Sequence, residues 1–316
     1  MKEHWVLSMT KDIILDCDPG HDDAIAALLA LTAPELSVQA VTTVAGNQTL
    51  SKTTQNIRQV ITLADRTDVP VASGMAEPMV RDLMVAENVH GKSGLDGPSL
   101  PNPMIDIVDE DAVDFIARTA RETGGVTLVP TGPLTNIGML LKRYTDVKRY
   151  IDEIVLMGGA MGTGNYTPAA EYNILVDPEA ADIVFNSTLP ITMVGLDATR
   201  KSRVQKKEFE RFRELETDVG KIVAEWLDFF LRYYEGQFGW DGVPIHDALA
   251  IAEVIDSKIV ETEKMYVAVE TSGDHTVGRT VCDQYDVLDA EPNIDVAFDV
   301  NRKAFVDLLV DAVARY

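Results

Sequence analysis

Four aspartates lie within eight positions near the start of the chain, at Asp16, Asp18, Asp22 and Asp23. Carboxylates this close repel one another unless a cation neutralises them. A cluster rich in carboxylates and poor in thiolates favours a hard divalent cation that prefers oxygen ligands. Helix capping by aspartate accounts for one or two of these acids but leaves Asp16 and Asp18 unexplained. The spacing therefore predicts a metal site.

The residues around the cluster place it at a strand-to-helix turn. The apolar run Ile13–Leu15 is typical of a short buried strand, and the Pro-Gly pair after the second aspartate ends it. A helix over Ala24–Thr32 follows. Asp22 and Asp23 would stand at the amino end of this helix, where the helix dipole favours negative charge.

The composition predicts one large, acidic α/β domain. The 316-residue chain is 46% hydrophobic, and its 51 acidic and 28 basic residues give a formal net charge of −23. Nucleic acid and anionic membranes are poor partners for such a surface, and no apolar run approaches the roughly 18 residues that a membrane span needs. Cys17 and Cys282 give no disulfide framework, which fits a reducing cytoplasm. We expect a cytoplasmic protein, with residues 1–11 as a possible N-terminal extension and Met9 as an alternative start.

Apolar runs alternate with helical patterns along most of the chain. This alternation predicts a single domain with a mostly parallel central sheet flanked by helices, in a Rossmann-like arrangement. The predicted strands are Ile13–Leu15, Val38–Val44, Val69–Ala72, Val126–Val129, Ile154–Met157 and Ile191–Val194. The predicted helices are Ala24–Thr32, Ser51–Ala64, Ala112–Glu122, Thr135–Lys142 and Pro178–Asn186. Later segments are a long amphipathic stretch over Lys206–Tyr234, a helix near Ala248–Ile255, and a small hairpin of Met265–Val269 and Arg279–Val281.

Polar residues follow five of the predicted strands. Open α/β sheets bind ligands beyond the carboxyl ends of their strands, so these residues favour a common site. Asn47 suits a sugar hydroxyl, although an ordinary turn asparagine fits the composition equally well. Thr131 would offer its main-chain carbonyl to a cation. The glycine-rich stretch Gly158–Gly164 lacks the spacing of a dinucleotide site.

Three histidines stand near predicted site elements. His246 begins a helical pattern next to an aspartate, so it is either a proton donor beside a metal ligand or a solvent-exposed cap. His90 lies in the longest segment without a predicted element. It is either a flap residue that touches substrate or a mobile surface histidine. His21 is expected behind the metal ligands or on the surface. The aromatic residues of Tyr233–Trp240 would stack on a planar ligand, although core packing is the more common meaning.

The chain resembles the inosine–uridine-preferring nucleoside hydrolases from Ile13 to about Asp256. The most specific feature is the DxDPGxDD element at Asp16–Asp23. Other matching segments are Val44–Asn47, Val89–Gly91, Pro130–Asn136, Met157–Gly159, Glu171–Asn173, Asp177–Ala181 and His246–Asp247. The resemblance implies the nucleoside hydrolase fold. It also implies calcium-dependent hydrolysis of the N-glycosidic bond of purine or pyrimidine ribonucleosides, which releases ribose and the free base.

The resemblance implies a role for each matching residue. Calcium would be held by the carboxylates of Asp18, Asp23 and Asp247 and by the main-chain carbonyl of Thr131, with Asp16 behind them. Asp22 would be the general base for the metal-bound water, and His246 would protonate the leaving base. The substrate would contact Asn47, Asn165, Glu171 and Asn173 at the ribose hydroxyls, Met157 beneath the sugar, and His90 in the base pocket. Family members form dimers or tetramers, so a homo-oligomer is also implied.

Two other functions remain compatible with the sequence. A haloacid-dehalogenase-type phosphatase also begins with a strand that ends in DxD, although it usually has Thr or Val where this chain has Gly20. A nucleoside- or sugar-binding protein without catalysis is the second alternative, and the intact Asp22 argues against it. The preferred nucleobase does not follow from the residues.

Overall fold

The computed structural model describes residues 10–316. Met9 and most of the possible N-terminal extension over residues 1–11 lie outside the described residues, while Lys11 is the first residue of the central sheet. Between residues 10 and 316, the structure contains no helix with the length and apolar character needed to cross a membrane.

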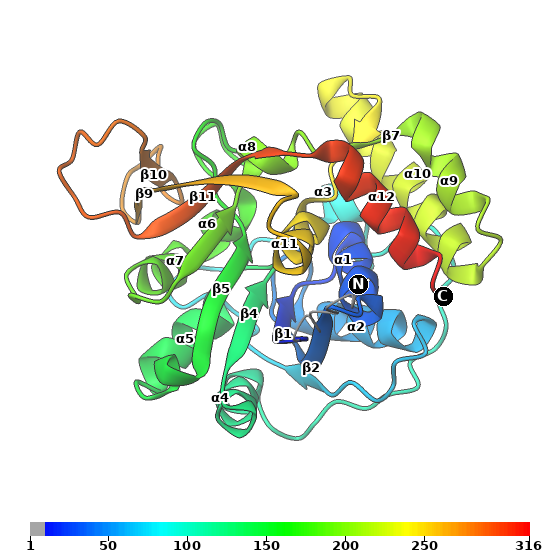
Figure 1. Cartoon of the computed structure of the whole chain (residues 1–316), viewed down its shortest axis with the longest axis horizontal. Helices are drawn as coiled ribbons and strands as arrows, with labels where there is room; N and C mark the ends of the chain where they lie inside the picture. The colour runs from blue at the N-terminus through cyan, green and yellow to red at the C-terminus, as the bar shows by residue number, and fades with distance from the viewer. Residues whose placement is uncertain (1–9) are drawn as a thin grey trace, which may run out of the picture.

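A nine-stranded sheet runs through the molecule in the order β10-β9-β11-β6-β5-β4-β1-β2-β3 (Figure 1). Its strands are β1 (Lys11–Cys17), β2 (Leu36–Thr43), β3 (Val71–Ser73), β4 (Val126–Pro130), β5 (Ile151–Met157), β6 (Ile191–Val194), β9 (Val260–Val269), β10 (Thr280–Asp283) and β11 (Ile294–Val300). Neighbouring strands from β11 to β3 are parallel, and β9 is antiparallel to both β10 and β11. The predicted mostly parallel sheet and the late hairpin are confirmed. A separate two-stranded ribbon pairs β7 (Val204–Gln205) with β8 (Gly242–Val243).

Helices cover both faces of the sheet (Figure 1). The main ones are α1 (His21–Thr32), α2 (Leu50–Leu63), α4 (Ala112–Thr123), α5 (Thr135–Arg143), α7 (Pro178–Phe185), α10 (Asp218–Phe238), α11 (His246–Ile255) and α12 (Arg302–Val313). Shorter ones are α3 (Glu87–His90), α6 (Tyr172–Val176), α8 (Leu196–Thr199) and α9 (Phe209–Arg213). Ile13 and Leu15 of β1 belong to one apolar core and Ile14 to the other, because successive strand residues point to opposite faces.

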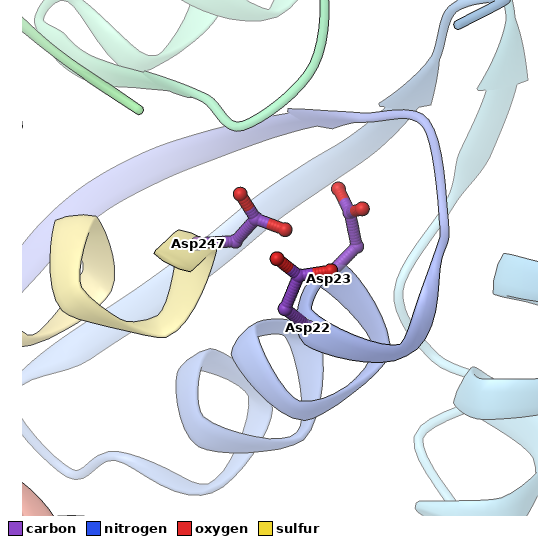
Figure 2. A group of neighbouring side chains, drawn as sticks. All are labelled: Asp22, Asp23 and Asp247. Carbon is purple, nitrogen blue, oxygen red and sulfur yellow. The ribbon is translucent and has the colours of Figure 1, made fainter. Parts of the chain in front are cut away.

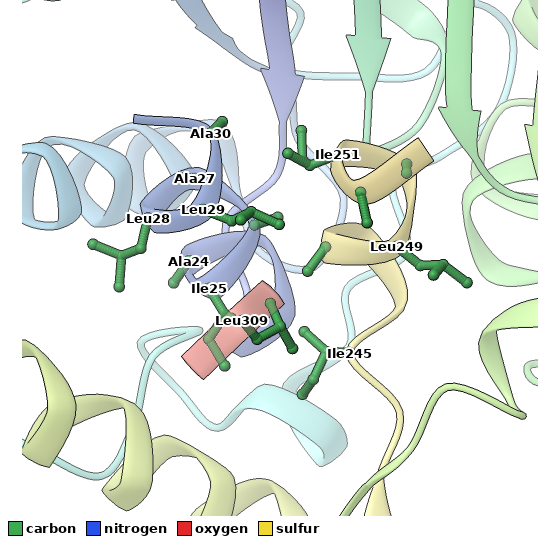
Figure 3. Packing of buried hydrophobic residues seen from close by; sticks show 14 of the residues in the cluster. Ala24, Ile25, Ala27, Leu28, Leu29, Ala30, Ile245, Leu249, Ile251 and Leu309 are labelled. Carbon is green, nitrogen blue, oxygen red and sulfur yellow. The ribbon is translucent and has the colours of Figure 1, made fainter. Parts of the chain in front are cut away.

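Helix α1 is buried along nearly its whole length. Figure 3 shows its apolar residues gathered with Leu249 and Ile251 of α11 and with Leu309 of α12. Alanines such as Ala24 and Ala27 let the neighbouring elements approach α1 closely, and both side chains are fully buried. This packing holds the amino ends of α1 and α11 near each other, although more than two hundred residues separate them in the sequence.

Some sequence expectations need correction. The stretch Lys206–Tyr234 is interrupted, because α9 ends at Arg213 and α10 begins after Thr217, whose side chain caps the new helix by accepting from the Gly220 N–H at 3.0 Å. Strand β3 begins at Val71, two residues later than expected. The sequence reasoning also did not predict β11 and α12.

Candidate active site

The predicted acidic cluster forms at the carboxyl end of β1. Carboxylate oxygens of Asp22, Asp23 and Asp247 all lie within 4.8 Å of one another. Figure 2 shows that Asp22 and Asp23 come from the first turn of α1 and Asp247 from the first turn of α11. All three residues are buried. Two helix amino ends therefore face each other across a group of carboxylates, and the helix dipoles favour negative charge there.

Two further aspartates surround this group. The Oδ2 atom of Asp18 accepts from the Asn47 backbone N–H at 2.6 Å. Asp16 lies behind, where one of its oxygens accepts from Thr42 Oγ1 at 2.5 Å and from Asn136 Nδ2 at 2.7 Å. Asp16, which the resemblance places behind the metal ligands, is thus held by two side-chain donors.

The cluster has fewer hydrogen-bond donors than its oxygens need. Within residues 10–316, the buried Oδ1 atoms of Asp18 and Asp22 have no hydrogen-bond partner. Burial, together with the neighbouring carboxylate of Asp23, raises the pKa of Asp22 to about 8. Burial also raises the pKa of Asp18 and of Asp247, and nearby carboxylates add to the effect. Buried carboxylates with free oxygens and no cationic partner are what a hard divalent cation would complete.

Asp23 and Thr131 are linked directly. Thr131 Oγ1 donates to Asp23 Oδ1 at 2.9 Å, and the Gly20 N–H donates to Asp23 Oδ2 at 3.0 Å. The side-chain amide of Asn47 also reaches Asp23 Oδ2, at 3.2 Å. These donors fix the Asp23 carboxylate in the centre of the cluster.

A pocket of about 740 Å³, open solvent at its mouth included, lies over the acidic cluster. Ten of the thirteen residues expected at the site line it: Asp22, Asn47, His90, Thr131, Met157, Asn165, Glu171, Asn173, His246 and Asp247. Asp16, Asp18 and Asp23 are not among the lining residues, since they lie deeper, at the end of β1 and the start of α1. The fold thus brings the predicted residues together around one pocket.

The residues expected to hold the sugar are themselves held by hydrogen bonds. Glu171 caps α6, and its carboxylate accepts from the backbone N–H groups of Asn173 at 2.9 Å and Gly159 at 3.0 Å. Asn165 Oδ1 accepts from the Tyr172 N–H at 3.0 Å. Polar groups held in this way form a preorganised polar wall of the pocket.

His246 is buried, so the alternative that it is a solvent-exposed cap is wrong. Its Nδ1 lies 2.6 Å from Thr199 Oγ1, and its Nε2 lies 3.1 Å from the Tyr234 hydroxyl. Burial, and next the positive charge of Arg200, lowers the pKa of His246 to about 3. The imidazole of the free protein is therefore neutral at pH 7.

His90 and His21 are also buried, which rules out a surface position for either residue. Nδ1 of His90 lies 3.2 Å from Nδ1 of His21. Burial lowers the pKa of His90 well below its usual range and that of His21 to about 4. Both rings are thus neutral near pH 7.

Five aromatic residues that line the pocket form its aromatic wall: Phe230, Tyr233, Tyr234, Phe238 and Trp240. The rings of Tyr234 and Trp240 are nearly parallel, at 3° and 5.5 Å between centroids. These aromatic residues therefore pack on one another and also line the pocket, so core packing alone does not describe them. Arg200, Tyr166, Tyr172 and Phe230 line the pocket without having been singled out from the sequence. Phe230 lies four residues before Tyr234, and that helical spacing was a usable signal.

Comparisons with known proteins agree with this geometry. The family model described as inosine-uridine preferring nucleoside hydrolase matches residues 13–307. Proteins named pyrimidine-specific ribonucleoside hydrolase RihA, from Photobacterium profundum and Shigella boydii, are each 50% identical over 310 residues, which cover 98% of this chain and all of theirs.

Solved structures give the same result. A purine-preferring ribonucleoside hydrolase from Gardnerella vaginalis has a TM-score of 0.91 at 34% identity, covering 96% of this chain and 98% of its own. A plant nucleoside hydrolase, PpNRh1, has a TM-score of 0.90 at 30% identity, covering 97% and 99%. The phosphatase and the non-catalytic binding protein are therefore set aside. The chain belongs to the inosine-uridine preferring nucleoside hydrolase family and is an N-glycosyl hydrolase that acts on ribonucleosides.

Proposed function

We propose that this protein hydrolyses pyrimidine ribonucleosides to ribose and free base with Ca²⁺ as its cofactor. The observation that carries the proposal is the set of buried, incompletely paired carboxylates beneath a pocket with one polar and one aromatic wall. Relatives that match the full length of the chain at 50% identity are named pyrimidine-specific, which supports the choice of base.

The residues present fit a calcium ion. Asp18, Asp23 and Asp247 would supply carboxylate oxygens, and Thr131 its main-chain carbonyl, all of the hard oxygen type that Ca²⁺ prefers. When bound, the ion supplies positive charge that offsets the carboxylates, acidifies water and orients the ribose hydroxyls. The family is metal-dependent, which agrees with the acidic cluster.

Asp22 is the proposed general base. Its Oδ1 atom is buried and has no partner among the described residues, and the side chain lines the pocket. The positive charge of a bound cation would lower the pKa of Asp22 and keep its carboxylate ionised. Asp22 would then take the proton from the attacking water as the water oxygen approaches the anomeric carbon of the ribose. A carboxylate in contact with that water raises its nucleophilicity in the transition state.

The polar wall would hold the sugar during bond cleavage. Hydrogen-bond donors and acceptors for the ribose hydroxyls would come from Asn47, Asn165, Glu171 and Asn173, with Met157 beneath the ring. N-glycosidic cleavage passes through an oxocarbenium-like state, and nearby carboxylates stabilise its positive charge. The wall is fixed before substrate binds, so little reorganisation is needed.

The leaving base would receive a proton from His246. The neutral ring carries one N–H proton, which it would give to the base as negative charge develops on the departing group. The ring would then recover a proton from solvent, and Asp22 would release to solvent the proton taken from the attacking water. The Tyr234 hydroxyl and Thr199 Oγ1, one on each ring nitrogen, fix the orientation of this imidazole. His90, which also lines the pocket, would contact the base.

A panel of ribonucleosides tests the proposal. With Ca²⁺ present, we expect base release from uridine and cytidine to exceed that from inosine and adenosine by at least tenfold in kcat/KM. We expect Asp22→Asn to retain binding of a nucleoside analogue and to lose activity by orders of magnitude. Faster turnover of inosine than of uridine would overturn the base preference, and an unimpaired Asp22→Asn variant would overturn the general-base role.

We also propose a homodimer or homotetramer that works in the cytoplasm. Tyr285, Val287 and Leu288 are 85%, 78% and 56% exposed, which is unusual for three apolar residues so close in sequence. Light scattering during gel filtration would report the subunit number. A monomeric mass at working concentration would exclude the oligomer.

A further inference from the structure

His21 stands inside the acidic cluster, but the proposed chemistry gives it no task. Its side chain is completely buried. Its Nδ1 lies 3.2 Å from Nδ1 of His90, and its backbone N–H donates to that same His90 atom at 3.3 Å. Its Nε2 lies 2.8 Å from the main-chain carbonyl oxygen of Asp96. His21 therefore contacts both a pocket residue and the loop that follows it.

Aromatic packing leaves these two rings little freedom. The His21 ring stacks on Phe229 at 4.9 Å between centroids and on Phe230 at 5.4 Å, and His90 packs on Phe230 at 5.2 Å. A Cβ atom added at Gly20 would lie 2.6 Å from the His90 ring. The His90 ring is thus confined between α10 and the backbone of the aspartate turn.

The loop that carries His90 has other anchors besides His21. Gln48 Nε2 donates to the carbonyl oxygens of Gly91 at 3.2 Å and Lys92 at 3.1 Å. Asn56 Nδ2 donates to the Ser93 carbonyl oxygen at 2.9 Å. Loss of the His21 ring nitrogens should therefore leave the loop in place and act mainly on the His90 ring.

Hydrogen-bond chemistry links the hydrogen positions of the two rings. The Asp96 carbonyl only accepts, so the hydrogen of a neutral His21 ring lies on Nε2 and its Nδ1 is an acceptor. His90 Nδ1 then either donates to the His21 ring or accepts from the His21 backbone. Within residues 10–316, these are the hydrogen-bond partners of the His90 side chain, and both belong to His21.

We propose that His90 Nδ1 donates to His21 Nδ1, so that His21 is a positioning residue that fixes the ring orientation and the tautomer of His90 and thereby decides how His90 Nε2 meets the nucleobase. The inference rests on the proposed function, in which His90 contacts the base. Its physical content is that the ring of His90, which lines the pocket, is set by a histidine that does not itself line the pocket.

His21→Phe is the first test, because it keeps a stacked ring and removes both ring nitrogens. We expect kcat/KM for uridine to fall about tenfold or more, the scale of loss seen when a residue that orients a metal-binding histidine is removed. For p-nitrophenyl riboside, which lacks a pyrimidine, we expect a loss of less than threefold. His275→Asn, at an exposed turn, is the control and should change neither value. Equal losses with both substrates would contradict the proposal.

Two conservative replacements separate the contacts of His21. Asparagine places a polar atom near the position of Nδ1, and glutamine places one near that of Nε2. We expect His21→Asn to recover more uridine activity than His21→Gln, because its polar atom faces His90. In a His90→Ala background, we expect His21→Phe to cause no further loss of more than twofold. Additive losses would show that His21 does not act through His90.

A measurement without turnover completes the test. In NMR spectra of ¹⁵N-histidine-labelled protein, we expect His21→Phe to change the chemical shifts of the His90 ring nitrogens to those of a different tautomer. The melting temperature should stay high enough for a folded sample. Unchanged His90 signals would overturn the inference. If wild type and His90→Ala release uracil at the same rate, the proposed contact of His90 with the base fails. If His90→Ala loses uridine activity but the His21 variants behave as wild type, the contact of His90 with the base stands and only the role proposed for His21 fails.

Discussion

The side-chain amide of Asn173 donates a hydrogen bond of 2.7 Å to the main-chain carbonyl oxygen of Thr131, and a second, of 3.1 Å, to that of Met157. Thr131 is also tied to the acidic cluster, because its hydroxyl donates to Asp23. The residue expected to hold the ribose is therefore connected through one short loop to the residues expected to hold the metal. Sugar binding and metal binding should respond together to changes at this position.

Replacement of Asn173 tests that connection. We expect Asn173→Ala to weaken calcium binding by about 10- to 100-fold, as seen when partners of metal ligands are removed, and to raise KM for uridine as well. Calorimetric titration of chelator-treated protein with Ca²⁺ measures the first effect. Asn186→Ala is the control, because Asn186 is exposed and lies in a turn after α7. A raised KM with unchanged calcium affinity would show that Asn173 serves the substrate alone.

Removal of the metal should stop the enzyme and destabilise it. Without a cation, the carboxylates of Asp22, Asp23 and Asp247 are buried within 4.8 Å of one another. A ligand that binds only the folded state at a hundredfold excess over its Kd stabilises that state by about 2.7 kcal/mol. We expect chelation to abolish base release and lower Tm, and Ca²⁺ to restore both.

Variants make the metal experiment specific. Asp23→Asn should lose the calcium-dependent rise in Tm, whereas Asp218→Asn, whose side chain is 92% exposed, should keep it. Full activity after exhaustive chelation, or recovery with Zn²⁺ but not with Ca²⁺, would contradict the assignment of the ion.

The early part of the fold followed from local sequence. Short apolar runs bounded by Pro, Gly and polar residues located β1, β4 and β5, because buried parallel strands carry continuous apolar side chains. Strand β11 was missed because Asp295 and Asp299 interrupt its apolar residues, as suits a strand with partly exposed positions. Without β11, nothing in the pattern placed the helix that follows it.

The site was predictable in its parts but not in its assembly. The aspartates of the turn stand together in sequence, whereas Asp247 joins them only through the packing of α11 on α1. Nothing local to His21 distinguishes a buried ring from an exposed one. The aromatic wall was ambiguous for a related reason, since helix residues that face a pocket repeat with the same period as those that face a core.

Loss of the His246 side chain should depend on the leaving group. We expect His246→Ala to reduce kcat for uridine far more than kcat for p-nitrophenyl riboside, because nitrophenolate leaves without a proton. General acid catalysis typically contributes about 10²- to 10⁴-fold, which sets the scale of the difference. Steady-state kinetics with both substrates measures it. Equal losses would argue that His246 holds the pocket together instead of donating a proton.

The aromatic wall should contribute to binding more than to chemistry. Trp240 stacks on Phe238 at 4.8 Å between centroids, and the Arg203 guanidinium lies 4.6 Å from the Trp240 ring. Stacking of a base on an aromatic side chain is worth about 1–3 kcal/mol, or roughly 5- to 150-fold in affinity. We expect Trp240→Ala to raise KM for uridine within that range and to change kcat little. Met104→Ala, at an exposed apolar residue outside the pocket, should leave KM unchanged.

Glu253 should make the stability of the protein depend on pH. Burial, and next the nearby Glu153, raises the pKa of this α11 carboxyl from 4.5 to about 8, and its buried Oε2 has no partner within residues 10–316. Below pH 4.5 the carboxyl is protonated in both folded and unfolded protein. As pH rises toward 8, the unfolded chain ionises first, so the favourable contribution of the protonated group to folding is progressively lost.

Glu253→Gln removes that dependence while it keeps the shape of the side chain. With Ca²⁺ saturating in every sample, we expect the variant to melt a few degrees above wild type at pH 8 and at nearly the same temperature at pH 5. Differential scanning calorimetry across this range provides the comparison, and Glu225→Gln on the exposed face of α10 is the matched control. A constant offset between variant and wild type at all pH values would mean that Glu253 is not the titrating group. A difference in melting temperature between variant and wild type that grows with pH would identify Glu253, and not the metal site, as the source of that part of the pH dependence.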